Sequence, residues 1–303
     1  MSVVGPSAAV TIADELALEE PAGSLPRRRA RLDPAAVVGL VLVGFVILLA
    51  LLAPVLASEG RTATGELRDR LLPPVFAGGS LEHWLGTDRQ GRDVWSRVAW
   101  GSQVTLLIGV TAVVVGGLVG VTTGIVAGYF RGRVDAVVGR LADVQQSIPF
   151  LVLALAVVAV LGASLANLIL VLGLGSWIFY HRVVRAEVLR IREQPYIEAA
   201  RALGESSRSV LRRDVLPNVL PSVIVVATLF VPQVIVFTAG LSFLGLGVPP
   251  PTPEWGRQIA DGTEYLRTAW WLTLVPSFFL VLTVIGVNLV GDWLRDVLDP
   301  TLR

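Results

Sequence analysis

Residues Gln194–Asn218 read QPYIEAARALGESSRSVLRRDVLPN, a polar, arginine-rich stretch between segments that are almost purely apolar. Pro195 suits the first turn of a helix, because proline has a fixed φ and no N–H to leave unpaired. Gly204 stands where a helix commonly ends in a left-handed residue. Ser206 or Ser207 can then cap a second helix. The pattern predicts a short helix, a glycine turn and a second helix that leads into the next apolar run.

The first of these helices has a distinctive apolar face. Its members recur at the i, i+3, i+4 and i+7 spacing of one helix side, and they are Tyr196, Ala199, Ala200 and Leu203. The two alanines at the centre of this face allow another surface to approach closely. Glu198 and Arg201 point elsewhere. The sequence therefore predicts a short helix with a contact surface for something outside the chain.

The rest of the chain has the composition of an integral membrane protein. Of its 303 residues, 53% are hydrophobic and 16% charged, and the mean hydropathy is +0.69. Globular proteins carry about 25% charged residues, and a membrane-spanning helix needs roughly 20 apolar residues. Six apolar runs are candidate spans: 35–57, 104–127, 148–161 (which could extend back towards 141), 165–180, 219–237 and 270–290. The first run is too long for the apolar core of a signal peptide. The third and fourth runs are separated only by residues 162–164, so we expect them to form a tight hairpin.

The placement of arginine predicts the orientation of these spans. With six spans both termini share a side, and 17 of the 25 arginines lie on that side. The positive-inside rule therefore places both termini and the segment 182–216 in the cytoplasm, with loops 58–100 and 240–268 outside. Residues 1–34 are polar and poor in aromatic side chains, which predicts a mostly disordered cytoplasmic tail before a six-helix transmembrane domain at 35–303.

Several kinds of chemistry are excluded by what the chain lacks. It has no lysine, so it cannot form the phosphate-binding loop of a Walker-type ATPase. It has no cysteine, which excludes disulfides and thiolate metal sites. Its two histidines fall on opposite sides of the predicted membrane, so we expect no metal site. Ionisable residues are absent from 148–180, 215–253 and 268–291. Because ion-coupled pumps carry such groups at membrane depth, any uphill transport must draw its energy from a partner.

Uncharged polar residues and glycines in the spans leave two readings open. Gln145 and Gln233 can line a transport path, although hydrogen bonding between helices is the more common role of such side chains. Small residues recur on one side of the second span, at Gly116, Gly117, Gly120 and Gly124. Because glycine lets helix backbones approach closely, we expect this side to pack against another helix inside a dimer of such membrane domains.

Glu198-Ala199-Ala200, then Gly204, then Leu216-Pro217 resembles the EAA motif of ABC importer permeases. In that family the motif forms a coupling helix that seats in a cleft of the ATP-hydrolysing subunit. The resemblance implies that the docking residues are Tyr196, Glu198, Ala199, Ala200, Leu203, Gly204, Leu216 and Pro217. Asp214 departs from the pattern, which usually has an apolar residue two positions before Leu-Pro.

Three further motifs resemble the dipeptide, oligopeptide and nickel permease subfamily, in particular the second, shorter permease of each pair. The loop 58–100 contains its outer-loop signature, with Gly86, Thr87, Asp88, Gly91, Arg92 and Asp93. The run Gly240–Gly247 followed by prolines is similar to its loop after the fifth span. The segment from Gly291-Asp292-Trp293 to Leu298-Asp299-Pro300 is similar to its C-terminal ending. The likeness covers residues from about 35 to the end.

The resemblance implies an all-α membrane protein with the six-helix architecture of type I ABC importer permeases, in the bacterial plasma membrane. It implies a heterodimer with a homologous permease, two cytoplasmic ABC ATPase subunits and an extracytoplasmic substrate-binding protein. ATP and magnesium would be bound by the ATPases, while this chain contacts lipid, binds no cofactor or nucleic acid, and catalyses no covalent chemistry. Closure of the ATPases would drive alternating access.

Several functions remain open on the sequence. Di- and oligopeptides are the commonest substrates in the subfamily, with nickel, opines and glutathione as alternatives. A channel or facilitator that works without an ATPase is a more distant possibility, and failure to bind any ATPase would favour it. A structural subunit of a membrane enzyme complex would instead co-purify with redox proteins.

Overall fold

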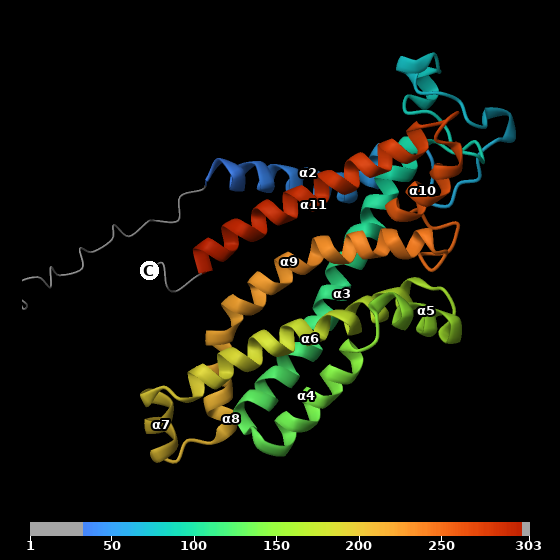
Figure 1. The fold of residues 1–303 in the computed structure, drawn as a ribbon. Coiled ribbons are helices and arrows are strands. Elements are labelled where there is room, and N and C mark those ends of the chain that lie inside the picture. Colours follow the sequence, from blue (N-terminus) through green and yellow to red (C-terminus); the bar gives the residue numbers. More distant parts are fainter. Residues whose placement is uncertain (1–32, 299–303) are drawn as a thin grey trace, which may run out of the picture.

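The computed structural model describes residues 33–298 (Figure 1). The predicted N-terminal tail lies almost wholly outside the described residues, as does the end of the C-terminal motif from Asp299. Within 33–298 the fold is all-helical, and the one extended pairing is an isolated bridge between Thr87 and Asp93. The long helices are α2 (Pro34–Leu56), α3 (Val94–Phe130), α4 (Gly132–Gln146), α5 (Phe150–Leu161), α6 (Leu165–Arg192), α9 (Leu216–Phe243) and α11 (Trp271–Leu298).

Shorter elements lie in the connections. Between α2 and α3 the chain forms the 3₁₀ turns η1 (Leu67–Asp69), η2 (Val75–Ala77) and η3 (Leu81–His83). The segment after α6 holds α7 (Pro195–Ala202), α8 (Ser207–Val210) and the π-helical turn η4 (Leu211–Val215). Between α9 and α11 lie α10 (Trp255–Gly262) and η5 (Thr263–Tyr265). The predicted loop 240–268 is thus partly helical, since α9 extends to Phe243 and α10 follows.

Five of the helices are each long and apolar enough to span a membrane: α2, α3, α6, the continuous helix Ser207–Phe243 and α11. The third predicted span is different. Helix α5 has 12 residues, about 18 Å at 1.5 Å per residue, which is shorter than the roughly 30 Å hydrocarbon core. It passes the test only together with α4, from which it is bent by 88°. The six predicted spans are present if this bent pair counts as one.

The segments that carry the predicted motifs lie at two ends of the molecule (Figure 1). The loop 57–93 and α10 lie together at one end, here called the α10 end, whereas α7 and α8 lie at the other, here called the α7 end. The first turn of α2 and the last turn of α11 also lie towards the α7 end. The two ends of the described chain therefore share a side with the segment 182–216.

The core is built on a close contact between α3 and α6. Every fourth residue of α3 from position 116 is a glycine, and a Cβ at Gly120 would lie 2.3 Å from the Trp177 carbonyl oxygen and 2.5 Å from the Tyr180 Cβ. Gly116, Gly124 and Gly128 meet α6 in the same way. The expected close helix contact is confirmed, but its partner is α6 of the same chain and not a helix of a second permease. Sequence spacing cannot distinguish a helix of the same chain from a helix of another chain.

Candidate functional site

The segment after α6 has the predicted local structure. Pro195 is at the first position of α7, and Gly204 adopts the left-handed conformation, with φ of +82°. Of the two possible caps, Ser206 is the one used, and its hydroxyl accepts from the Ser209 N–H at 3.4 Å. The helix that follows is continuous through Leu216 and Pro217 to Phe243.

The predicted apolar face of α7 is open to its surroundings. Tyr196 is 49% exposed and Leu203 is 88% exposed. Ala199 is also exposed and Ala200 is half-buried, so small side chains lie between two large ones. Glu198 is exposed as well. The structure thus leaves uncovered the surface that the sequence pattern predicted for an outside contact.

Ile197 is the residue of α7 that sequence reasoning missed. It is 0% exposed and lies in a buried cluster with Val184, Val188, Val210 and Val215. No local spacing marks Ile197 as buried. It lies about 100° around the helix from Tyr196, so the buried inner face adjoins the exposed outer face at Ala200, which packs against the same cluster. This inner face holds α7 against α6 and η4, and it turns the outer face away from the protein.

Asp214, the departure from the family pattern, lies in the π-helical turn η4. The Leu216 N–H donates to the Leu211 carbonyl five residues earlier, and the Asn218 amide donates to the Asp214 carbonyl at 2.5 Å. A π turn admits one extra residue into the helix. Asp214 is thereby accommodated half-buried, while its neighbour Val215 is fully buried.

At the α10 end, Asp88 organises the predicted outer-loop motif. One carboxylate oxygen accepts from the backbone N–H groups of Gln90 at 2.7 Å and Arg92 at 3.0 Å. The other accepts from the Arg92 side chain at 2.6 Å and lies 3.6 Å from Arg97. Backbone bonds close the same turn, from Asp88 to Arg92 and from Gly91 to Asp88. The carboxylate therefore holds together a turn that the sequence predicted only as a motif.

The remaining motif residues fasten this turn to the helices. Asp93 caps α3 by accepting from the Ser96 N–H at 2.7 Å, and its other oxygen lies 3.2 Å from His83 Nδ1. The Thr87 carbonyl accepts from the Trp271 indole at 3.3 Å. At Gly86 and Gly91 φ is positive, and a Cβ would lie 2.5 Å and 2.0 Å from the nearest backbone oxygen. All six predicted residues lie in one structural unit.

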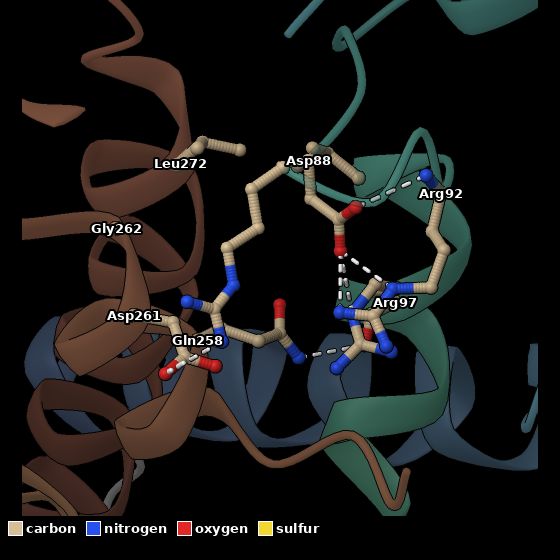
Figure 2. Close-up of a pocket in the computed structure, with 9 residues that line it drawn as sticks. Asp88, Arg92, Arg97, Gln258, Asp261, Gly262 and Leu272 are labelled. Atoms are coloured by element: carbon tan, nitrogen blue, oxygen red, sulfur yellow. Dashed lines mark hydrogen bonds and ion pairs between the residues drawn. The ribbon is translucent and has the colours of Figure 1, made fainter. Parts of the chain in front are cut away.

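Figure 2 shows the small cavity beside this unit, lined by Asp88, Arg92, Arg97 and residues of α10. Its volume is about 30 Å³, room for a water molecule or two. Gln258 of α10 donates to the Arg97 carbonyl at 2.9 Å, and Asp261 lies 3.9 Å from Arg89. The cavity is too small for a substrate. It marks a polar joint between the outer-loop motif and α10.

A buried carboxylate holds α10 to the end of α9. Glu254 is 1% exposed. It accepts from the N–H groups of Gly256 at 2.6 Å and Arg257 at 2.7 Å, and from the Ser242 hydroxyl at 3.0 Å. Burial raises the pKa of Glu254, against the opposing effect of these hydrogen bonds. Next to it, the Trp255 indole donates to the Val98 carbonyl in α3 at 2.9 Å.

The two candidate path-lining residues have different surroundings. Gln145 at the end of α4 donates to the Leu174 carbonyl at 2.6 Å and accepts from the Trp177 indole at 2.8 Å. Both partners are on α6, so Gln145 forms a bond between helices. Gln233 in α9 is exposed on the surface of the single chain. The structure does not bring the two residues together.

In the part of the chain that the structure describes, no group of three or more His, Asp and Glu side chains is placed to hold a metal ion.

Two family models match the chain. The model for the binding-protein-dependent transport system inner membrane component matches residues 120–303, and the model for the N-terminal TM domain of oligopeptide transport permease C matches residues 25–74. The fold is similar to that of a chain in the inward-facing MetNI methionine ABC transporter, with a TM-score of 0.55 and 22% identity. That match covers 67% of this chain and 96% of the other.

Curated relatives resemble the chain over nearly its whole length. The dipeptide transport system permease protein DppC of Alkalihalophilus pseudofirmus is 37% identical, over 91% of this chain and 89% of that protein. The probable D,D-dipeptide transport system permease protein DdpC of Escherichia coli is 39% identical over 88% of each. The oligopeptide transport system permease protein OppC of Bacillus subtilis is 37% identical, over 91% of this chain and 88% of that protein. The chain therefore belongs to the family of binding-protein-dependent transport system inner membrane components, and is a non-catalytic, multi-pass permease component of a bacterial ABC importer.

Proposed function

We propose that this chain forms half of the translocation path of an ATP-driven importer of di- or oligopeptides. Its partners would be a homologous permease, two cytoplasmic ABC ATPases that bind ATP and magnesium, and an extracytoplasmic substrate-binding protein. The named relatives support peptides as the substrate class, since their names describe dipeptide and oligopeptide transport. The arginine distribution supports a cytoplasmic location for the α7 end.

The observation that carries the coupling role is the exposed face of α7. It presents Ala199 between Tyr196 and Leu203, large enough at its ends to fill a cleft and small enough at its centre for close approach. The same segment continues as one helix from Ser207 to Phe243. Closure of two docked ATPases would therefore act on the inner end of α9, and the path would open alternately to each side.

The test is a co-purification with Ala199→Trp. The exposed position of Ala199 means that the indole leaves the fold intact and blocks the docking face. The matched control is Arg208→Trp, also exposed, on α8. Both variants and the native chain are expressed with the neighbouring genes and purified in mild detergent, and the associated proteins are identified by mass spectrometry.

The expected result is a P-loop ATPase with the native chain and with Arg208→Trp, and its loss with Ala199→Trp while the companion permease is retained. If Ala199→Trp retains the ATPase, docking takes place elsewhere. If no ATPase co-purifies with the native chain, the result contradicts the importer and favours a passive channel. Uptake of a labelled dipeptide into vesicles, challenged with nickel, an opine and glutathione, then tests the substrate class.

A further inference from the structure

Tyr129, in the last turn of α3, lies under the segment that carries the proposed docking face. The residue is 5% exposed and belongs to the same buried cluster as Ile197 of α7. Its position at the end of α3 brings three parts of the chain together: α3 itself, the end of α6 and α7. An aromatic ring at such a meeting point is a candidate for setting how α7 is oriented.

Two arginines place their guanidinium groups over this ring. The guanidinium carbon of Arg201, on α7, lies 4.9 Å from the ring centre, and that of Arg192, at the end of α6, lies 5.8 Å from it. Arg192 also donates to the Tyr129 carbonyl. Cations within about 6 Å of an aromatic face are attracted by its negative quadrupole. The ring therefore draws together two like charges that would otherwise repel each other.

Few other contacts hold α7 in its orientation. An isolated helix of eight residues is unstable in water, so tertiary contacts must fix both its presence and its rotation about its own axis. Ile197 is its fully buried side chain. Half-buried Ala200 packs against the same cluster, but only with its small methyl group. The stacking of Arg201 on Tyr129 adds a contact from a long side chain in the last turn, and so opposes rotation of the helix about its axis.

The preceding turn is held by the same neighbourhood. Glu193, at the end of α6, forms an ion pair with Arg131 at 2.5 Å, and Arg131 follows directly after α3. The start of α7 is thus held close to the end of α3 by charge, and its last turn is held there by Arg201. These two contacts, at the start and at the last turn of α7, fix the orientation of the helix and of its outer face relative to α3.

We infer that Tyr129 is a positioning residue: its ring fixes the rotation of α7 through Arg201, and so keeps Tyr196, Ala199 and Leu203 facing outward. This inference rests on the proposed function only for its consequence, which is that an ATPase finds the docking face already oriented. Leucine at position 129 keeps apolar volume and removes the ring. Phenylalanine keeps the ring and removes only the hydroxyl.

The first experiment needs no partner protein. Because the chain has no cysteine, spin labels can be attached at Arg133→Cys and Leu203→Cys, both exposed, and the distance distribution between them measured in the purified permease. Tyr129→Leu is expected to broaden or shift that distribution, whereas Tyr129→Phe is expected to leave it unchanged. Arg201→Gln should reproduce Tyr129→Leu, and the double variant should add nothing further, because both changes remove the same contact.

The second experiment measures binding of the purified ATPase subunit to unlabelled permease. We expect Tyr129→Leu to weaken binding by about 5- to 30-fold, the effect of losing cation–π contacts of about 1–2 kcal/mol, and Tyr129→Phe to change it less than twofold. An unaltered distance distribution in Tyr129→Leu would overturn the inference, whatever the ATPase does. A shifted distribution with native ATPase binding would support the role of Tyr129 and contradict α7 as the docking site. Thermal unfolding of each variant separates these outcomes from loss of the fold.

Discussion

Replacing Glu254 tests the joint between α9 and α10. Glu254→Ala leaves three donors without their acceptor: the N–H groups of Gly256 and Arg257 and the Ser242 hydroxyl. Loss of a helix N-cap costs about 1 kcal/mol, and each buried donor left unpaired costs about 1–3 kcal/mol. Removing a buried carboxylate offsets part of this. We expect a net loss of about 2–4 kcal/mol in the free energy of unfolding.

The contribution of Glu254 to the free energy of unfolding should also depend on pH. Burial raises the pKa of Glu254 above its ordinary value, so the folded chain binds this proton more tightly than the unfolded chain. The stabilising contribution is therefore complete below the ordinary glutamate pKa. It is lost as the pH rises through the raised pKa of the folded state. Glu254→Gln keeps one acceptor oxygen and has no titration.

The assay is thermal unfolding of the permease in detergent across pH 4–8, followed by circular dichroism. The difference in melting temperature between the native chain and Glu254→Gln should decrease as the pH rises. Glu264→Gln, an exposed carboxylate between α10 and α11, is the control and should follow the native chain. A difference that does not change with pH would refute the assignment of a raised pKa. Native stability in Glu254→Ala would refute the joint itself.

Three other substitutions follow from single contacts. Asp88→Asn removes the charge that faces Arg92 and Arg97, and is expected to destabilise the protein by about 2–4 kcal/mol and to speed limited proteolysis of the loop 57–93. Gly120→Ala places a Cβ 2.3 Å from a carbonyl oxygen of α6, so the protein should fail to accumulate in the membrane, while Gly44→Ala, with open space around it, should accumulate normally. Gln145→Ala breaks two bonds to α6 and should lower the melting temperature by the equivalent of about 1–2 kcal/mol, whereas Gln233→Ala should not change it.

Local signals made the segment around α7 predictable. Pro195, Gly204 and a capping serine act within one or two turns of their own positions, and each has the predicted role. The buried position of Ile197 is different in kind. It depends on valines that come from α6, α8 and η4, so no local pattern contains it. The outward direction of the exposed face followed only once this inner contact was known.

Long-range packing explains the other differences. The break between α4 and α5 falls beside Pro149, and proline favours the end of a helix. The 88° angle between the two helices depends on the packing of α5 against other helices, which the local sequence does not contain. The glycines of α3 have the right spacing for a close helix contact, and spacing does not say which helix makes it. Glu254 stands in a Pro-rich loop with no sequence signal for burial. Its carboxylate is tolerated there because three donors converge on it.

The two predicted functional surfaces are joined by α9. This helix begins beside the docking segment and ends at Phe243, where Ser242 donates to Glu254 and so to α10. Gln258 of α10 in turn donates to the Arg97 carbonyl of α3, and the Arg97 side chain lies 3.6 Å from Asp88 of the outer-loop motif. We predict that a displacement at the α7 end reaches the outer loop through the bond between Ser242 and Glu254.

Ser242→Ala tests this connection with little loss of stability, since it removes one hydrogen bond worth about 1 kcal/mol. In the assembled importer we expect the ATPase to remain bound and to hydrolyse ATP, while peptide transported per ATP decreases. Thr238→Ala, one turn earlier on α9, loses only a bond to the Val234 carbonyl of the same helix and should transport normally. Equal transport per ATP in the two variants would mean that the outer loop follows α9 by packing alone. The carboxylate would then serve stability and not coupling.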